Sequence, residues 1–125
     1  MKMRRIDHVV LTVTDLEQSM RFYHEVFDMP VIKEQSNDDL ITMRCGHQLI
    51  RLQKIDRPIT LKAADPTIGS ADLCLVAGDS IDDIVHHLNS YYIDIIAGPI
   101  VKQGAEGEMT SLYVYDPDNN LIEIA

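Results

Sequence analysis

Four residues of this sequence carry side chains that could do chemistry while lying among aliphatic neighbours. They are His8, Arg51, Asp72 and Glu123. An imidazole or a carboxylate can bind a metal or transfer a proton, and a guanidinium can bind a carboxylate. Burying such a group among apolar residues is costly unless it is paired. We therefore expect these four residues to contact one another, a metal or water.

The four residues occupy equivalent places in a sequence pattern that occurs twice. The segment Ile6–Leu11 is echoed by Ser70–Leu75, and Leu49–Leu52 is echoed by Leu121–Ile124. The copies are offset by 64 positions in the first case and by 72 in the second. A unit of about 60 residues is therefore duplicated, with a few extra residues in the second copy. If the two modules pair with pseudo-twofold symmetry, the four polar residues converge on one site.

Strand periodicity assigns these residues to one face of each predicted sheet. Side chains alternate between the faces of a strand. Ile50 and Leu52 should pack on the helix of their module, as should Ile122 and Ile124. The opposite face then carries the remaining side chains of these strands, which are Leu49, Arg51, Gln53, Leu121 and Glu123.

Helical spacing follows the first predicted strand. Thr14–Glu17 resembles a capping box, and apolar residues then recur at helical spacing as far as Phe27. This helix should end before Pro30. Three extended segments are predicted next, near Val31–Glu34, Leu40–Cys45 and Gln48–Gln53.

The second copy repeats this order of elements. A helix begins at Ser80 and continues to about Tyr91. Strands are predicted near Ile93–Ile96, Ile100–Lys102, Met109–Tyr115 and Leu121–Ile124. Each copy therefore reads β-α-β-β-β, with a break at Gly98-Pro99. We predict a single domain over residues 1–125, with module one at about 1–54, a linker at about 55–69 and module two at about 70–125.

Composition excludes several classes of function. The chain has 125 residues, 46% of them hydrophobic and 25% charged, and a net charge of −9. Such an acidic chain is poorly suited to bind nucleic acid, which requires clustered Lys and Arg. No stretch is long enough to span a bilayer, and the basic start lacks the features of a secretory signal, so no membrane association and a cytoplasmic location are expected.

The two cysteines, Cys45 and Cys74, lie in predicted strands and do not suggest a disulfide framework. Cys45 and His47 could be read as a thiol beside an activating imidazole. The alternative is that Gly46-His47 forms a hairpin turn between two strands, which the flanking periodicity favours.

The segment Ser111–Glu123 has an Asp-Pro-Asp turn before a strand Glu. This segment and several others resemble the vicinal oxygen chelate superfamily, which includes glyoxalase I, bleomycin-resistance proteins, fosfomycin thiol transferases and extradiol dioxygenases. Ser111–Glu123 is the most specific of the matching segments. Asn119 stands where the family usually has Gly, which is tolerable because Asn enters left-handed backbone geometry readily. The other matching segments are Ile6–Val9, Arg21–Tyr23 and Pro66–Cys74. The resemblance is closest to small glyoxalase-like members.

The resemblance implies an α+β fold in which two tandem β-α-β-β-β modules form an open, cupped mixed β-barrel around one divalent metal. By the family pattern the metal ligands are His8, Asp72 and Glu123. Asp72 falls where many members have a second His, and Arg51 falls where glyoxalase I has a Glu. Mn, Ni, Zn, Mg and Fe are not distinguished, although oxygen-rich ligands slightly favour Mn or Mg.

The implied function is that of a metal-dependent glyoxalase-like lyase or isomerase acting on a small oxygenated substrate. Glu123 and Asp72 are the candidate catalytic residues, because either could shuttle a proton. Arg51, Tyr113 and Gln53 are the candidate substrate-binding residues. Arg51 could instead neutralise the two acids in a metal-free salt bridge.

The sequence is also compatible with two other functions. The first is a metal-free protein that binds or sequesters a small molecule, as in the bleomycin-resistance branch, and Arg51 in a ligand position favours it. The second is an extradiol dioxygenase. Taken singly, each site residue could also be an ordinary core or surface residue. The resemblance further favours a twofold homodimer.

Overall fold

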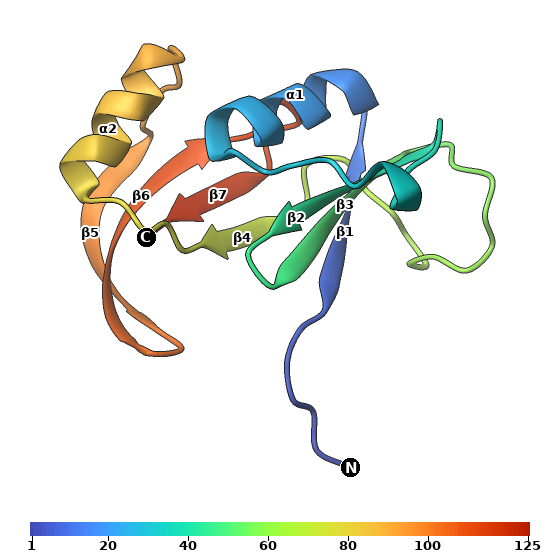
Figure 1. Cartoon of the computed structure of the whole chain (residues 1–125), viewed down its shortest axis with the longest axis horizontal. Coiled ribbons are helices and arrows are strands. Elements are labelled where there is room, and N and C mark those ends of the chain that lie inside the picture. Colours follow the sequence, from blue (N-terminus) through green and yellow to red (C-terminus); the bar gives the residue numbers. More distant parts are fainter. The chain divides into compact units, whose positions relative to one another are not determined.

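The computed structural model describes residues 1–125, which divide into two compact units, Met1–Gly69 and Ser70–Ala125. Each unit has one open sheet and one α-helix (Figure 1). The seven strands therefore form two sheets, and neither sheet closes into a barrel on its own. Neither helix is long and apolar enough to cross a membrane.

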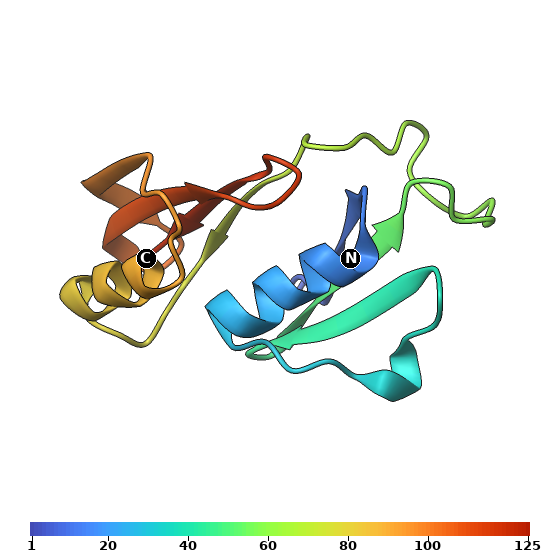
Figure 2. The same cartoon turned by 90° about the horizontal axis from the view of Figure 1, so that it is seen from above.

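The sheet of the first unit has the strand order β1-β3-β2. Its strands are β1 (His8–Val13), β2 (Leu40–Cys45) and β3 (Gln48–Lys54). The central strand β3 runs parallel to β1 and antiparallel to β2. Figures 1 and 2 show helix α1 (Leu16–Phe27) along one face of this sheet.

Helix α1 begins one residue later than the predicted capping box. Asp15 is the N-cap, and its carboxylate accepts a hydrogen bond of 3.0 Å from the backbone N–H of Gln18. The helix ends at Phe27, where Asp28 takes a left-handed conformation with φ 55°. Met29 N–H then bonds back to the carbonyl of Tyr23. The predicted end before Pro30 is confirmed.

The core of the first unit lies between the sheet and α1. Ile50 and Leu52 are buried, as predicted, and the helix contributes Tyr23 and Val26. Each such apolar side chain contributes about 1.5–3 kcal/mol when it is removed from water. This one-sided core leaves the other face of the sheet to His8 and Arg51.

The predicted strand Val31–Glu34 is wrong in extent. Val31 forms only an isolated bridge with Met43, and Lys33–Gln35 is a 3-10 turn, η1. Polar bonds favour this turn, because Thr42 Oγ1 donates to the carbonyl of Gln35 at 2.6 Å. The predicted hairpin turn at Gly46-His47 is confirmed, with Gly46 at φ 59°.

The second unit has the strand order β4-β7-β6-β5. Its elements are β4 (Asp72–Leu75), α2 (Ile81–Ser90), β5 (Ala97–Gly104), β6 (Gly107–Tyr115) and β7 (Leu121–Ile124). Ser80 caps α2, as predicted, by accepting from the N–H of Asp83 at 3.2 Å. Ile122 and Ile124 are buried, also as predicted.

The predicted strand Ile93–Ile96 does not form. The residues after α2 complete the end of the helix instead, since Ile93 N–H bonds to the carbonyl of Leu88 and Tyr92 takes a φ of 57°. Strand β5 therefore begins at Ala97 and includes the predicted strand Ile100–Lys102. The predicted break at Gly98-Pro99 corresponds to a register shift between Ala97 and Ile100 within β5.

The duplication inferred from the sequence is present in the strand registers. In the parallel pair β1–β3, His8 lies opposite Leu49 and Val10 lies opposite Arg51. In the parallel pair β4–β7, Asp72 lies opposite Leu121 and Cys74 lies opposite Glu123. His8 is therefore equivalent to Asp72, and Arg51 to Glu123. The predicted α+β fold of two related modules is confirmed.

A buried polar turn fixes the start of β7, the strand that carries Glu123. Asp116 and Asn120 are only 4% and 2% exposed. Asn120 donates its side-chain and backbone N–H groups to the two carboxylate oxygens of Asp116, each at 2.8 Å. Its amide oxygen accepts from the N–H of Ala71, just before β4. The turn thus ties together the two strands that bear the acidic residues.

Asn120→Ala should lower the free energy of unfolding by about 1–3 kcal/mol, because it removes the hydrogen bonds of the Asn120 side chain to the buried Asp116 carboxylate and to the backbone N–H of Ala71. Urea unfolding followed by circular dichroism measures this loss. The control is Asn119→Gly, at an exposed neighbouring residue whose φ of 63° suits glycine. Equal stability of Asn120→Ala and wild type would contradict the assigned role.

Candidate functional site

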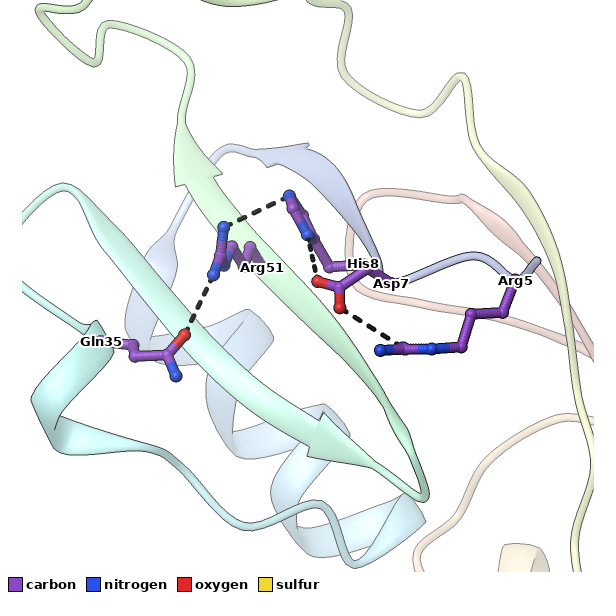
Figure 3. A network of polar contacts seen from close by, with 5 residues as sticks. All are labelled: Arg5, Asp7, His8, Gln35 and Arg51. Atoms are coloured by element: carbon purple, nitrogen blue, oxygen red, sulfur yellow. Dashed lines mark hydrogen bonds and ion pairs between the residues drawn. The ribbon is translucent and has the colours of Figure 1, made fainter. Parts of the chain in front are cut away.

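A chain of polar contacts crosses the face of the first sheet that is turned away from α1 (Figure 3). It consists of Arg5, Asp7, His8, Gln35 and Arg51, and we call it the His8–Arg51 cluster. Arg51 Nη1 lies 3.2 Å from His8 Nε2, and Arg51 Nη2 donates to Gln35 Oε1 at 3.0 Å. His8 Nδ1 lies 2.9 Å from Asp7 Oδ2. The parallel register of β1 and β3 brings His8 and Arg51 together.

The contacts of His8 define the tautomer of its neutral ring. Arg51 has only donors, so His8 Nε2 must accept the hydrogen bond from Nη1. His8 Nδ1 then carries the proton and donates to the Asp7 carboxylate. A carboxylate that receives Nδ1–H holds an imidazole in the form in which Nε2 presents a lone pair. Here Arg51 uses that lone pair.

Asp7 stays ionised in this arrangement. The hydrogen bond from His8 holds the pKa of the Asp7 carboxyl below its usual range, and the positive charge of Arg5, whose Nη1 lies 3.4 Å away, acts in the same direction. Asp7 is itself exposed to solvent. It therefore orients the His8 ring without being a buried charge.

Arg51 has no carboxylate partner within its own unit. Its two hydrogen-bonded neighbours, His8 and Gln35, are both acceptors without charge when His8 is neutral. The Nε atom of Arg51 is buried and has no hydrogen-bond partner. The guanidinium is therefore held in place by neutral groups, and part of its donor capacity is not used.

Gln53, the third candidate on this face, is engaged in internal bonds. Its side chain is buried, with Nε2 donating to Thr12 Oγ1 at 3.0 Å and Oε1 accepting from Arg57 Nη1 at 3.5 Å. These bonds support β3 beside Arg51. A direct contact between Gln53 and a substrate stays a prediction.

The second unit carries a polar cluster on the face that is not packed by Ile122 and Ile124. Ser111 Oγ donates to Glu123 Oε2 at 2.6 Å. Register places Glu123 between Cys74 on β4 and Tyr113 on β6. We call Cys74, Ser111 and Glu123 the Glu123 cluster. Asp72 lies on the same face at the start of β4, as the alternation of side chains requires.

The Glu123 cluster keeps the Cys74 thiol protonated. Partial burial raises the pKa of Cys74, and the charge of Glu123, its hydrogen bond with the thiol and the charge of Asp72 raise it further. Burial alone raises the pKa of Cys45. Because the thiolate is the reactive form, neither cysteine has the environment of an activated nucleophile.

Sequence reasoning missed five side chains of these clusters, which are Arg5, Asp7, Gln35, Cys74 and Ser111. Ser111 and Cys74 could have been found, because each is two residues from a predicted site residue and so shares its sheet face. Gln35 gave no such signal, since it lies one residue beyond the predicted strand Val31–Glu34. Within either unit alone, no three His, Cys, Asp or Glu side chains form a metal-binding group.

Glu123→Gln should accelerate alkylation of Cys74 by iodoacetamide at pH 7.5 by about threefold or more, because it removes a negative charge that disfavours the thiolate. Quantitative peptide mass spectrometry measures the rate at each cysteine. Cys45 is the internal control, since its raised pKa has no contribution from Glu123. Equal rates at Cys74 in the variant and the wild type would refute this electrostatic coupling.

The whole chain is similar to known proteins. Residues 5–124 match the family model described as "Glyoxalase/Bleomycin resistance protein/Dioxygenase superfamily". Virulence protein STM3117 of Salmonella typhimurium is 41% identical over 121 residues, covering 97% of this chain and 83% of that protein. Its crystal structure matches with a TM-score of 0.92 over 99% of this chain and 97% of the other.

Two further relatives agree with this assignment. The glyoxalase domain-containing protein RDO1 of Mycosarcoma maydis is 38% identical over 125 residues, covering 100% of this chain and 69% of that protein. An integron cassette protein from the mobile metagenome of V. cholerae is 36% identical, with a TM-score of 0.92 and coverage of 99% and 95% of the two chains. The chain therefore belongs to the glyoxalase/bleomycin resistance protein/dioxygenase superfamily.

Proposed function

We propose that this protein is a divalent-metal-dependent, glyoxalase-like lyase or isomerase that acts on a small oxygenated substrate. Superfamily membership supports the class of reaction. The observation that carries the proposal is the His8 ring, which Asp7 orients so that Nε2 presents its lone pair. This carboxylate–imidazole arrangement is typical of histidines that ligate metals.

His8, Asp72 and Glu123 are the proposed ligands, supplied by one chain or by two. One imidazole nitrogen and two carboxylates suit Mn, Mg, Fe, Ni or Zn. Arg51, in contrast, cannot ligate a metal, because a guanidinium has no lone pair to offer. The donor set therefore fits a three-ligand site rather than a four-ligand one. A bound metal would act as a Lewis acid toward two adjacent substrate oxygens.

The residues of the chain supply the proton chemistry in this proposal. Ser111 binds one oxygen of Glu123 and so fixes the orientation of its carboxylate. Glu123, or Asp72 on the same sheet face, then takes a proton from the substrate carbon and returns it to a neighbouring atom. Tyr113 lies beside Glu123 in the register, where its ring can limit access to the carboxylate.

His8→Ala should lower the affinity for Mn²⁺ by at least about tenfold, because it removes a ligand. Calorimetric titration of metal-free protein measures this affinity, and Ni²⁺ and Zn²⁺ are titrated in parallel. The control is His47→Ala, at an exposed residue of the β2–β3 turn. Unchanged metal affinity in His8→Ala would contradict the proposed metal site. Failure of the wild type to bind any of these ions would contradict it as well.

A metal-free binding protein is the second candidate. The hydrogen bond from Arg51 to His8 Nε2 favours it, because this bond occupies the nitrogen that a metal would need. The same titration separates the two candidates. A wild-type protein that binds no metal but binds a small molecule through Arg51 would belong to this second class.

The family resemblance also supports a homodimer with isologous contacts. We expect light scattering coupled to size-exclusion chromatography to give twice the chain mass of 14.2 kDa. The edge strand β5 exposes Ile100 and Val101, and such apolar side chains are commonly covered by a partner. A monomer at micromolar concentration would refute the dimer.

A further inference from the structure

Arg51 is a cation held only by uncharged groups of its own unit. The one acidic residue of the His8–Arg51 cluster, Asp7, has other partners, since it binds His8 and Arg5. Asp39 on the same unit pairs with Lys54 at 3.8 Å. A guanidinium gains more from an anion than from neutral acceptors, because charge-assisted hydrogen bonds are shorter and stronger. The Arg51 fork is therefore available to an anionic ligand.

The donor geometry indicates what kind of anion would fit. A guanidinium has five N–H donors in a rigid plane and matches a carboxylate with two parallel bonds. Nη1 and Nη2 each donate one bond, to His8 and to Gln35, and the Nε–H has no partner. A carboxylate that took the place of His8 would accept from Nη1 and would give the guanidinium an anionic partner, which it lacks within its own unit. The Nε–H is buried and takes no part in this contact.

A second cation, Arg44, lies on the same sheet face. Arg44 on β2 pairs in register with Leu49 on β3, so its side chain lies on the same sheet face as Arg51. Arg44 is exposed and can attract an anion without holding it in a fixed geometry. It is therefore a matched control, with the same charge on the same face.

We propose that Arg51 binds a carboxylate of the substrate and that this contact releases His8 Nε2 to bind the metal. This inference rests on the proposed function and names its substrate class as a small carboxylic acid that also carries oxygen for the metal. Arg51 and the metal need the same lone pair of His8, so they compete when no anion is present. An anion on Arg51 removes that competition.

The coupling must be reciprocal. If a carboxylate raises the affinity for metal, the metal raises the affinity for the carboxylate by the same factor. Arg51 would thus disfavour metal binding in the absence of substrate and permit it in its presence. This behaviour differs from that of a fixed counter-ion, which would keep its contacts in both states.

The first experiment tests anion binding on metal-free protein. Sodium acetate replaces sodium chloride at constant ionic strength, while nitrogen-15 NMR follows the side-chain Nε of Arg51 and the ring nitrogens of His8. We expect saturable shifts at both residues, with half-saturation at roughly tens of millimolar acetate, as the strength of a charge-assisted hydrogen bond implies. Arg51→Met should abolish the His8 shift on acetate addition, and Arg44→Met should change the acetate affinity less than about twofold.

Arg51→Lys is the second variant, because it keeps the charge but lacks the planar fork. It should weaken acetate binding by about fivefold or more while keeping the thermal stability near that of wild type. Equal weakening in the Arg51 and Arg44 variants would overturn the proposal in favour of a general positive field. If the Arg51 Nε shift saturates with acetate while the ring nitrogens of His8 do not shift, the proposed release of His8 Nε2 is wrong.

The second experiment tests the coupling. Mn²⁺ affinity is measured by calorimetry in chloride and in acetate at equal ionic strength. Wild type should bind Mn²⁺ at least about threefold more tightly in acetate, whereas Arg51→Met should show no acetate effect and should bind Mn²⁺ in chloride at least as tightly as wild type does. Weaker Mn²⁺ binding in Arg51→Met would contradict the competition.

The two proposals can fail separately. If Mn²⁺ binds and depends on His8 but acetate has no effect, the metal site stands and the role of Arg51 is wrong. If acetate binds to Arg51 and shifts His8 but no metal binds, the release of His8 for a metal fails together with the lyase proposal, and the metal-free binding function is supported.

Discussion

The alternation of side chains along two parallel strand pairs is the constraint on which both clusters depend. In β1–β3 and in β4–β7 the register is the same, so one face of each pair packs aliphatic side chains into the core. A slip of one residue would move Arg51 or Glu123 into that core, where an unpaired charge is strongly unfavourable. The hydrophobic face therefore determines the position of the polar one.

This constraint explains which features could be predicted from the sequence. Ile50, Leu52, Ile122 and Ile124 were assigned correctly to the buried face, because strand periodicity is a local property. The errors fall where local pattern and polar bonding compete. Val31–Glu34 has strand-like residues, yet the side chains of Ser36 and Thr42 bond to the turn that interrupts it. Strand propensity alone does not predict these side-chain contacts.

The partner of Arg51 could not be predicted for a similar reason. Charge arguments pointed to Asp72 and Glu123 as its counter-ions. The structure of the first unit shows uncharged partners instead, His8 across the strand pair and Gln35 from the η1 turn. Gln35 reaches Arg51 only because the chain turns at Lys33–Gln35 instead of continuing as a strand.

Divergence after the duplication has given the two open faces opposite character. The first carries Arg44 and Arg51 beside a neutral imidazole, and the second carries Asp72 and Glu123, whose charges keep Cys74 protonated. The first face therefore suits an anion and the second suits a cation. Arg51 and Glu123, at equivalent positions in two copies of one module, thus carry charges of opposite sign.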